Sequence, residues 1–240
     1  MRRRLFLILK FSEKGHCRKE NQDFLIAKSN DKNKITVIAL ADGAGSSVYG
    51  RIGAEIACLT ACDELLNIFS NDEQNMTTGE MKYQVMSSVL RELNLFVNKF
   101  ELKNDLRDVA STLLIFALEK KTGRYVCLHL GDGLILQIEK DDIRLLSGPS
   151  NGITKKFTDL TSSCNCIRKT RLYYGKAMPD ETTGFIMFSD GAAELLWDGL
   201  SVQGEVADLM KNRRWRQLEE WLVQQQPEDD YSFIVLENQG

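Results

Sequence analysis

Histidine is scarce in this 240-residue sequence, which contains only His16 and His129. A zinc site or a Ser-His-Asp triad therefore has few possible parts. No G-x-S-x-G elbow occurs either, so a metal-independent ester hydrolase lacks its usual nucleophile and its base. These absences argue against zinc chemistry and against serine hydrolase chemistry.

An excess of basic charge and long apolar runs are also missing. The 34 acidic residues outnumber the 31 basic ones and give a net charge of -3, which argues against a nucleic-acid partner. Three arginines precede an apolar run that begins at Leu5, but this run ends at Lys10 without a cleavage site, so we expect a strand and no signal peptide. No stretch approaches the roughly 20 apolar residues of a membrane span. We expect a soluble, cytoplasmic protein without a membrane partner.

The six cysteines do not form a metal or disulfide framework. Cys58 and Cys62 lie four apart in a helical pattern, and Cys127 lies in an apolar strand run, as is typical of core residues. Cys164 and Cys166 form a C-x-C without a second pair, which is weak evidence for zinc. Reduced thiols in the cytoplasm explain this usage most simply.

The apolar pattern predicts an α+β fold in which helices cover sheets. Three- and four-residue apolar steps predict two long helices between residues 41 and 111, from Ile52 to Phe69 and from Met86 to Phe100, and a third from Trp215 to Gln225. Hairpin-like spacing at 121–123 and 131–133 indicates antiparallel strands. No repeat or linker interrupts residues 1–240, so we expect one domain. Strands are expected near 3–11, 24–29, 34–41, 111–119, 124–131, 133–139, 142–146, 170–174, 184–189 and 231–236.

Aspartates recur at the ends of the apolar runs. Asp42, Asp132 and Asp190 each precede a glycine after such a run, and the pair Asp229–Asp230 precedes the last one. Each Asp-Gly alone is typical of a turn. If the strand ends meet at one edge of the sheets, the carboxylates converge and repel one another unless a counter-charge is present. Divalent Mg²⁺ or Mn²⁺ is the natural counter-charge for oxygen ligands.

Paired divalent ions favour one reaction class in particular. Two ions roughly 3.5–4 Å apart can share and activate a water and clamp phosphoryl oxygens. The charge on those oxygens also requires a fixed guanidinium. Arg18 is the candidate, because it lies in a polar stretch between two apolar strands. The pattern therefore indicates metal-dependent hydrolysis of phosphate esters.

Six segments, in order along the chain, resemble the signature elements of the metal-dependent protein phosphatases, the type 2C family, and most of all its compact bacterial branch. The elements are R-x-x-N-[EQ]-D, D-G-x-G, G-S-T, G-D-S, S-D-G and D-[ND]-x-[ST]. The resemblance implies a four-layer α-β-β-α sandwich of two antiparallel sheets, with metal ions in a cleft between the sheets. The matching segments are Arg18–Asp23, Asp42–Gly45, Ala110–Thr112, Gly131–Gly133, Ser189–Gly191 and Asp229–Ser232.

The resemblance also implies roles for single residues. Asp42 would bridge two Mn²⁺ or Mg²⁺ ions, the Gly43 carbonyl would bind one of them, and Arg18 would hold the substrate phosphate beside Asp42 in the catalytic centre. Asp190 and Asp229 would bind the other ion, and Asp23 would act through a metal-bound water. A third ion would lie near Asp132, Asp190 and Glu194.

Three departures from the family pattern bear on the site. Gln22 stands where many members have Glu, and Ala44 stands where eukaryotic members have a histidine proposed as general acid. A metal-bound water or another group, such as the nearby His16, would then donate the proton. Asp230 replaces the usual Asn, and the register favours Asp229 as the ligand. Residues 148–161 fall where the family has a variable flap.

The resemblance implies a phosphoserine/phosphothreonine phosphatase, expected to be a monomer, that opposes a bacterial Ser/Thr kinase in signalling. A phosphatase dedicated to one regulatory protein, such as an anti-sigma antagonist, would use the same chemistry. The alternative is a catalytically silent binding module of the same fold. The presence of Asp42, Asp190 and Asp229 favours the enzyme.

Overall fold

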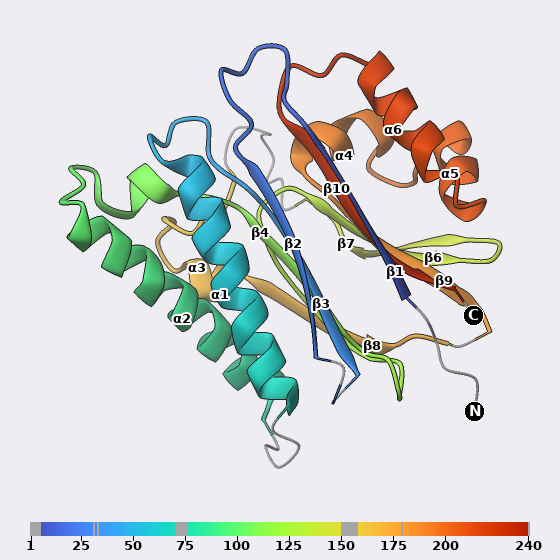
Figure 1. Cartoon of the computed structure of the whole chain (residues 1–240), viewed down its shortest axis with the longest axis horizontal. Helices are drawn as coiled ribbons and strands as arrows, with labels where there is room; N and C mark the ends of the chain where they lie inside the picture. The colour runs from blue at the N-terminus through green and yellow to red at the C-terminus, as the bar shows by residue number, and fades with distance from the viewer. Residues whose placement is uncertain are drawn as a thin grey trace.

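Two antiparallel sheets of five strands pack face to face between two layers of helices (Figure 1). This computed structural model describes residues 6–30, 32, 34–70, 76–149, 158–178 and 180–239. The first sheet has the strand order β1 (Phe6–Glu13), β10 (Tyr231–Asn238), β9 (Thr182–Phe188), β6 (Leu134–Glu139) and β7 (Ile143–Ser147). The second has the order β2 (Asp23–Asn30), β3 (Ile35–Asp42), β4 (Leu113–Glu119), β5 (Arg124–Leu130) and β8 (Arg171–Lys176).

The helices divide between the outer faces of the two sheets. The long helices α1 (Gly50–Ser70) and α2 (Thr78–Lys99) pack on the second sheet, and α4 (Asp190–Leu196), α5 (Gly204–Lys211) and α6 (Trp215–Gln224) pack on the first. Two short helices precede strands of the second sheet in the chain: η1 (Asp105–Val109) precedes β4, and α3 (Cys166–Lys169) precedes β8. The expected four-layer α-β-β-α architecture is confirmed.

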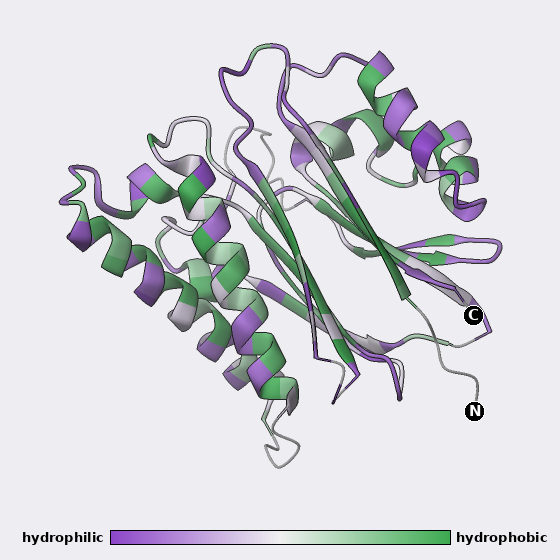
Figure 2. Cartoon of the chain, in the orientation of Figure 1, coloured by the Kyte–Doolittle hydropathy of each residue, from purple (hydrophilic) through white to green (hydrophobic). Residues whose placement is uncertain are grey.

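Strand periodicity explains why there are three hydrophobic cores. In β4, Leu113 and Ile115 face α1 and α2, whereas Leu114 and Phe116 face the opposite sheet. The side chains of a strand alternate between its two faces, so a strand buried on both faces must be apolar almost throughout. Figure 2 shows this as nearly continuous hydrophobic colour along the central strands.

Two local features fix the long helices on their sheet. Thr77 and Glu80 form a reciprocal capping box at the start of α2, which satisfies two otherwise unpaired backbone donors. Small residues such as Ala57 and Ala61 on the buried face of α1 let this helix lie close to β3. Cys58 and Cys62 share that face, and burial raises the pKa of both thiols. All six cysteines are free, as expected.

One predicted turn has a different role. The hairpin expected at Lys121–Gly123 joins β4 to β5, but Gly131–Gly133 is not a hairpin, because β5 and β6 belong to different sheets. Gly131 has a positive φ of 121°, a conformation that side-chain-bearing residues rarely adopt, at the point where the chain passes from one sheet to the other.

Other boundaries also differ from the sequence prediction. Helices α4 and α5 were not predicted, and α4 begins at Asp190, where the Asp-Gly pair indicated a turn. Strand β1 runs to Glu13, beyond the predicted end at Phe11, and residues 3–5 of the predicted strand lie outside the described part. Residues 150–157 of the expected flap also lie outside it. No helix in the described residues is long and apolar enough to span a membrane.

Candidate metal and phosphate site

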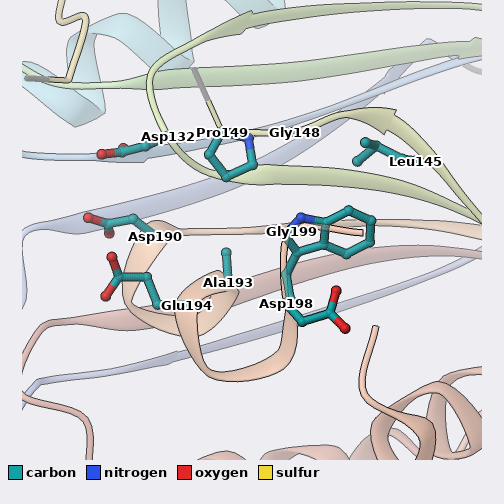
Figure 3. A pocket seen from close by; sticks show the side chains of 10 residues that line it. Asp132, Leu145, Gly148, Pro149, Asp190, Ala193, Glu194, Asp198 and Gly199 are labelled. Carbon is teal, nitrogen blue, oxygen red and sulfur yellow. The ribbon is translucent and has the colours of Figure 1, made fainter. Parts of the chain in front are cut away.

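The predicted carboxylates come together at one edge of the sandwich. Asp23 begins β2 and Asp42 ends β3, where the two are direct cross-strand partners. Asp132 lies in the turn between the sheets, Asp190 follows β9 and Asp229 precedes β10. Figure 3 shows the carboxylates of Asp132, Asp190 and Glu194 turned to the same side of a cavity. The edge thus gathers the acidic residues of both sheets.

These carboxylates destabilise one another's charged forms. Burial raises the pKa of Asp42 well above its ordinary value, and repulsion from Asp190 and Asp23 raises it further. Burial followed by repulsion from Asp132 and Asp23 does the same to the pKa of Asp190. Burial is also the main cause that raises the pKa of Asp132. A nearby cation would relieve this repulsion and stabilise the ionised carboxylates.

Asp23 is the most deeply buried member of the cluster. Its exposed fraction is 0%, and burial raises its pKa to about 6, although the nearby Ser232 and Ser189 hydroxyls lower it. Neither carboxylate oxygen of Asp23 meets hydrogen-bond geometry with any described group, and the same holds for Oδ1 of Asp132. Buried polar oxygens without partners are costly. They fit the hard oxygen shell of a divalent cation.

The carboxylates do not close around a single point. Among the described residues, no three or more Asp, Glu, His or Cys side chains are close enough to form a metal-binding group. Mg²⁺ commonly keeps several of its waters and is held by only one or two carboxylates. The residues present therefore fit hydrated divalent ions better than a fully enclosed protein cage.

Arg18 and Asp229 form a two-pronged ion pair across the site. The Arg18 Nε donates to Asp229 Oδ1 at 2.5 Å, and its Nη2 donates to Oδ2. This pairing raises the pKa of Arg18, and about a third of each side chain stays exposed. The fork that matches a carboxylate also matches a phosphate. The guanidinium predicted to hold phosphate is thus paired with a predicted metal ligand.

Asp230 has a structural role that the sequence did not reveal. Its buried carboxylate accepts backbone N–H bonds from Gly15 at 3.0 Å and from Gln22 at 2.8 Å. These bonds tie the Arg18 loop to the start of β10. Both oxygens of Asp230 are thus held by backbone donors, whereas those of Asp229 are held by the Arg18 side chain and by the Asp230 amide.

We expect Asp230→Asn to destabilise the fold. An asparagine has one acceptor oxygen and an NH₂ group, so one of the two backbone donors would lose its partner, at a cost of about 1–3 kcal/mol. Urea unfolding of metal-free protein measures this loss. Glu228→Gln, the same chemical change at the exposed neighbouring residue, is the control. Equal midpoints for wild type and Asp230→Asn would contradict the tethering role.

Gly43 is needed for a close approach of two backbone segments. A Cβ atom there would come within 2.3 Å of the Gly50 carbonyl carbon at the start of α1. The Gly43 amide also donates to the Gln22 carbonyl at 3.2 Å. Gly43, whose carbonyl is predicted to bind a metal ion, therefore lies where any side chain would clash with the backbone at the start of α1.

Glu194, on α4, separates two cavities at the site. On one side it lines a cavity of about 350 Å³ with Asp132 and Asp190. On the other it lines a cavity of about 430 Å³ with Arg18 and Asp229. Both cavities border residues predicted for metal or phosphate binding, which leaves room for a substrate on either side of α4.

Both histidine side chains hydrogen-bond to groups other than these carboxylates. His16 Nδ1 bonds to the Pro227 carbonyl at 2.8 Å. His129 Nδ1 bonds to the Ser147 hydroxyl at 2.7 Å, and burial lowers the pKa of His129 well below its ordinary value. Ala44, in the loop after Gly43, has no group to donate a proton.

Comparison with known proteins identifies the family. A model of the protein phosphatase 2C family matches residues 14–225. A comparison with curated protein sequences finds no match.

Several solved structures share the fold at low sequence identity. A bacterial serine phosphatase is 14% identical, with 97% of this chain and 98% of that one covered and a TM-score of 0.71. The serine/threonine phosphatase Stp1 from Staphylococcus aureus is 15% identical, with 98% and 96% covered and a TM-score of 0.71. RsbX in complex with magnesium is 15% identical, with 99% and 97% covered and a TM-score of 0.60. Since the family model spans most of the sequence, this chain belongs to the protein phosphatase 2C family of metal-dependent protein phosphatases.

Proposed function

We propose that this chain hydrolyses phosphoserine and phosphothreonine esters of proteins with the help of two Mn²⁺ or Mg²⁺ ions. The cluster of Asp23, Asp42, Asp132 and Asp190 supports this proposal most strongly. Burial raises the pKa of all four carboxyls, and three of their buried oxygens accept no hydrogen bond of adequate geometry from the described residues. When bound, two such ions activate water and neutralise charge on the phosphoryl oxygens.

Each acidic residue has a proposed part in holding these ions. Asp42, at the end of β3, would bind both ions, and the Gly43 carbonyl would bind one of them. Asp190 and Asp229 would bind the other ion, and Asp23 would act through a water. A third, looser ion would be held by Asp132, Asp190 and Glu194.

Arg18 binds the substrate phosphate by exchanging partners. In the structure its fork is occupied by Asp229. A phosphoryl group offers the guanidinium a second set of charged acceptors, and a cation offers Asp229 a new partner. Substrate and metal binding together would therefore replace the Arg18–Asp229 ion pair by two others: Arg18 with the phosphate, and Asp229 with a metal ion.

The proton for the leaving serine or threonine oxygen would come from solvent in the cleft. His16 is bonded to the Pro227 carbonyl and His129 is buried against Ser147. Neither imidazole is therefore poised as the acid that the family's histidine would supply at Ala44.

We further propose that the chain acts as a monomeric domain in the bacterial cytoplasm, in signalling, on the products of a Ser/Thr kinase. Its six free cysteines fit a reducing compartment. The acidic balance of the sequence gives no support for nucleic-acid binding.

Matched phosphopeptides test this function. Three peptides of one sequence, with phosphoserine, phosphothreonine or phosphotyrosine, are incubated with metal-stripped protein and added Mn²⁺ or Mg²⁺. We expect metal-dependent phosphate release that is faster from the serine and threonine esters than from the tyrosine ester. Undiminished release in a chelator, or no release from folded protein that binds Mn²⁺, would contradict the proposal, and the second result would favour a silent binding module.

A further inference from the structure

The cavity beside Asp132 and Asp190 has two chemically different ends. Figure 3 shows the carboxylates of Asp132, Asp190 and Glu194 at one end, Leu145 at the other and Pro149 between them. Ala193 and Trp197 complete the apolar part of the lining. Among its described lining residues none is basic, and Asp198 adds a fourth carboxylate. The cavity is therefore an apolar slot with negative charge at its borders.

The segment after α4 is a hydrogen-bonded turn that holds one of these charges. Trp197 and Val202 pair as an antiparallel bridge, and Gly199 between them has a φ of 99°. Oδ1 of Asp198 accepts backbone N–H bonds from Leu200 at 2.8 Å and from Ser201 at 2.7 Å. These bonds lower the pKa of Asp198, so its exposed carboxylate stays ionised at neutral pH.

The opposite cavity contains a basic residue as well as acidic ones. Its lining includes Arg18, whose guanidinium is paired with Asp229, together with Glu194 and Glu228. A cationic group entering there would meet Arg18 directly. The slot near Trp197 presents no such repulsion in its described lining.

Building on the proposed phosphatase activity, we propose that the slot is a subsite for an arginine or lysine side chain that flanks the phosphorylated residue in the substrate protein. The aliphatic stem of such a side chain can pack on Leu145 and Pro149, while its charged head lies near the Trp197 ring and Asp198. A purely apolar side chain would cover the walls but bring no charge to the carboxylates at the rim. An acidic side chain would be repelled by the Asp198 carboxylate.

Bound metal ions do not remove this complementarity. They would neutralise Asp132, Asp190 and Glu194, which are the proposed ligands, and would leave Asp198 as the uncompensated carboxylate of the lining. Asp198 lies beyond that cluster and is held by its own turn. Its charge therefore remains available to select the substrate.

A phosphothreonine peptide series tests the subsite. Arginine, alanine or glutamate is placed at each of the three positions on either side of the phosphothreonine, and kcat/KM is measured with Mn²⁺, alongside hydrolysis of p-nitrophenyl phosphate. We expect arginine to exceed alanine by about fivefold at one position, the order expected for one exposed charge pair and a cation–π contact. Glutamate should be poorer than alanine there, and the preference should weaken with added salt.

Two variants locate the preference in the slot. Asp198→Asn keeps the oxygen that accepts the turn N–H bonds but removes the charge, and Trp197→Leu keeps an apolar wall but removes the aromatic face. Both should reduce the arginine-to-alanine ratio towards one. Asp208→Asn, the same change at an exposed carboxylate on α5, should leave the ratio at its wild-type value.

The outcomes separate the subsite from the catalytic proposal. Equal kcat/KM for the arginine, alanine and glutamate peptides, with p-nitrophenyl phosphate still hydrolysed, would overturn the subsite and leave the phosphatase intact. An arginine preference that survives in both Asp198→Asn and Trp197→Leu would also overturn it. If neither the peptides nor p-nitrophenyl phosphate released phosphate, the proposed phosphatase function itself would fall.

Discussion

Asp42→Asn is expected to lower the rate of phosphate release at saturating Mn²⁺ by more than roughly 100-fold. Mutation of a residue that only hydrogen-bonds to a metal ligand typically lowers activity by about 10- to 100-fold, and loss of a ligand should lower it further. Asp42 lies at the end of β3, where burial and the charges of Asp190, Asp23, Asp229 and Asp132 all raise its pKa. No other carboxylate in the cluster is proposed to hold both ions. The backbone bond from the Asp42 amide to the Thr112 hydroxyl does not involve the side chain, so the strand end should be preserved.

The same variant should make the metal-free protein more stable. A carboxyl whose pKa is raised by folding destabilises the folded state at neutral pH when it is ionised, and a neutral amide removes that penalty. Relief of about 1 kcal/mol corresponds to a rise in Tm of roughly 2–4 °C in a chain of this size. Asp63→Asn, on the exposed face of α1, is the control for the chemical change. Wild-type rates for Asp42→Asn at limiting Mn²⁺ would show that Asp42 does not hold the ions.

Arg18→Ala should raise KM for phosphopeptides by about 10- to 100-fold with a smaller change in kcat, since hydrogen bonds to charged groups contribute about 1.5–3 kcal/mol. The reason is the loss of the guanidinium fork that faces Asp229 and would face phosphate. Initial rates across a range of phosphopeptide concentrations measure the split between KM and kcat. Arg216→Ala, at an exposed position on α6, is the matched control.

Mn²⁺ affinity distinguishes phosphate binding from metal binding in this variant. Removal of Arg18 frees the Asp229 carboxylate, so Mn²⁺ should bind at least as tightly as in the wild type. Arg18→Lys should recover only part of the KM effect, because an ammonium restores charge but not the two-pronged geometry. An unchanged KM in Arg18→Ala would place phosphate binding elsewhere.

Strand periodicity made most of the sandwich predictable from sequence. Central strands such as β4 are buried on both faces and are therefore apolar almost throughout, which marks them clearly. The path of the chain between β5 and β6 was not predictable, because the Gly131–Gly133 spacing suits a hairpin as well as a crossing between sheets. Helix α4 was missed because seven residues, Asp190–Leu196, are too few to show a helical period.

The residue types of the site were predictable, but their pairings were not. Asp-Gly at strand ends predicted several carboxylates at one edge, and the fold brings them there. The Arg18–Asp229 pair joins residues 211 positions apart, and nothing local in the sequence indicates it. The tethering by Asp230 depends on distant backbone N–H groups, which leave no mark in the sequence. The turn held by Asp198 does contain an Asp-Gly pair, but its place beside the site is not local information. The assigned roles of the metal ligands remain predictions.

Counting bound Mn²⁺ while measuring turnover tests the two-metal proposal most directly. Metal-stripped protein is equilibrated with increasing Mn²⁺, and bound ions per chain and phosphate release from a phosphothreonine peptide are measured on the same samples. We predict at least two ions per wild-type chain, activity that rises as the second binds, and fewer ions with almost no activity in Asp42→Asn. Full activity with one bound ion or none would contradict the proposal.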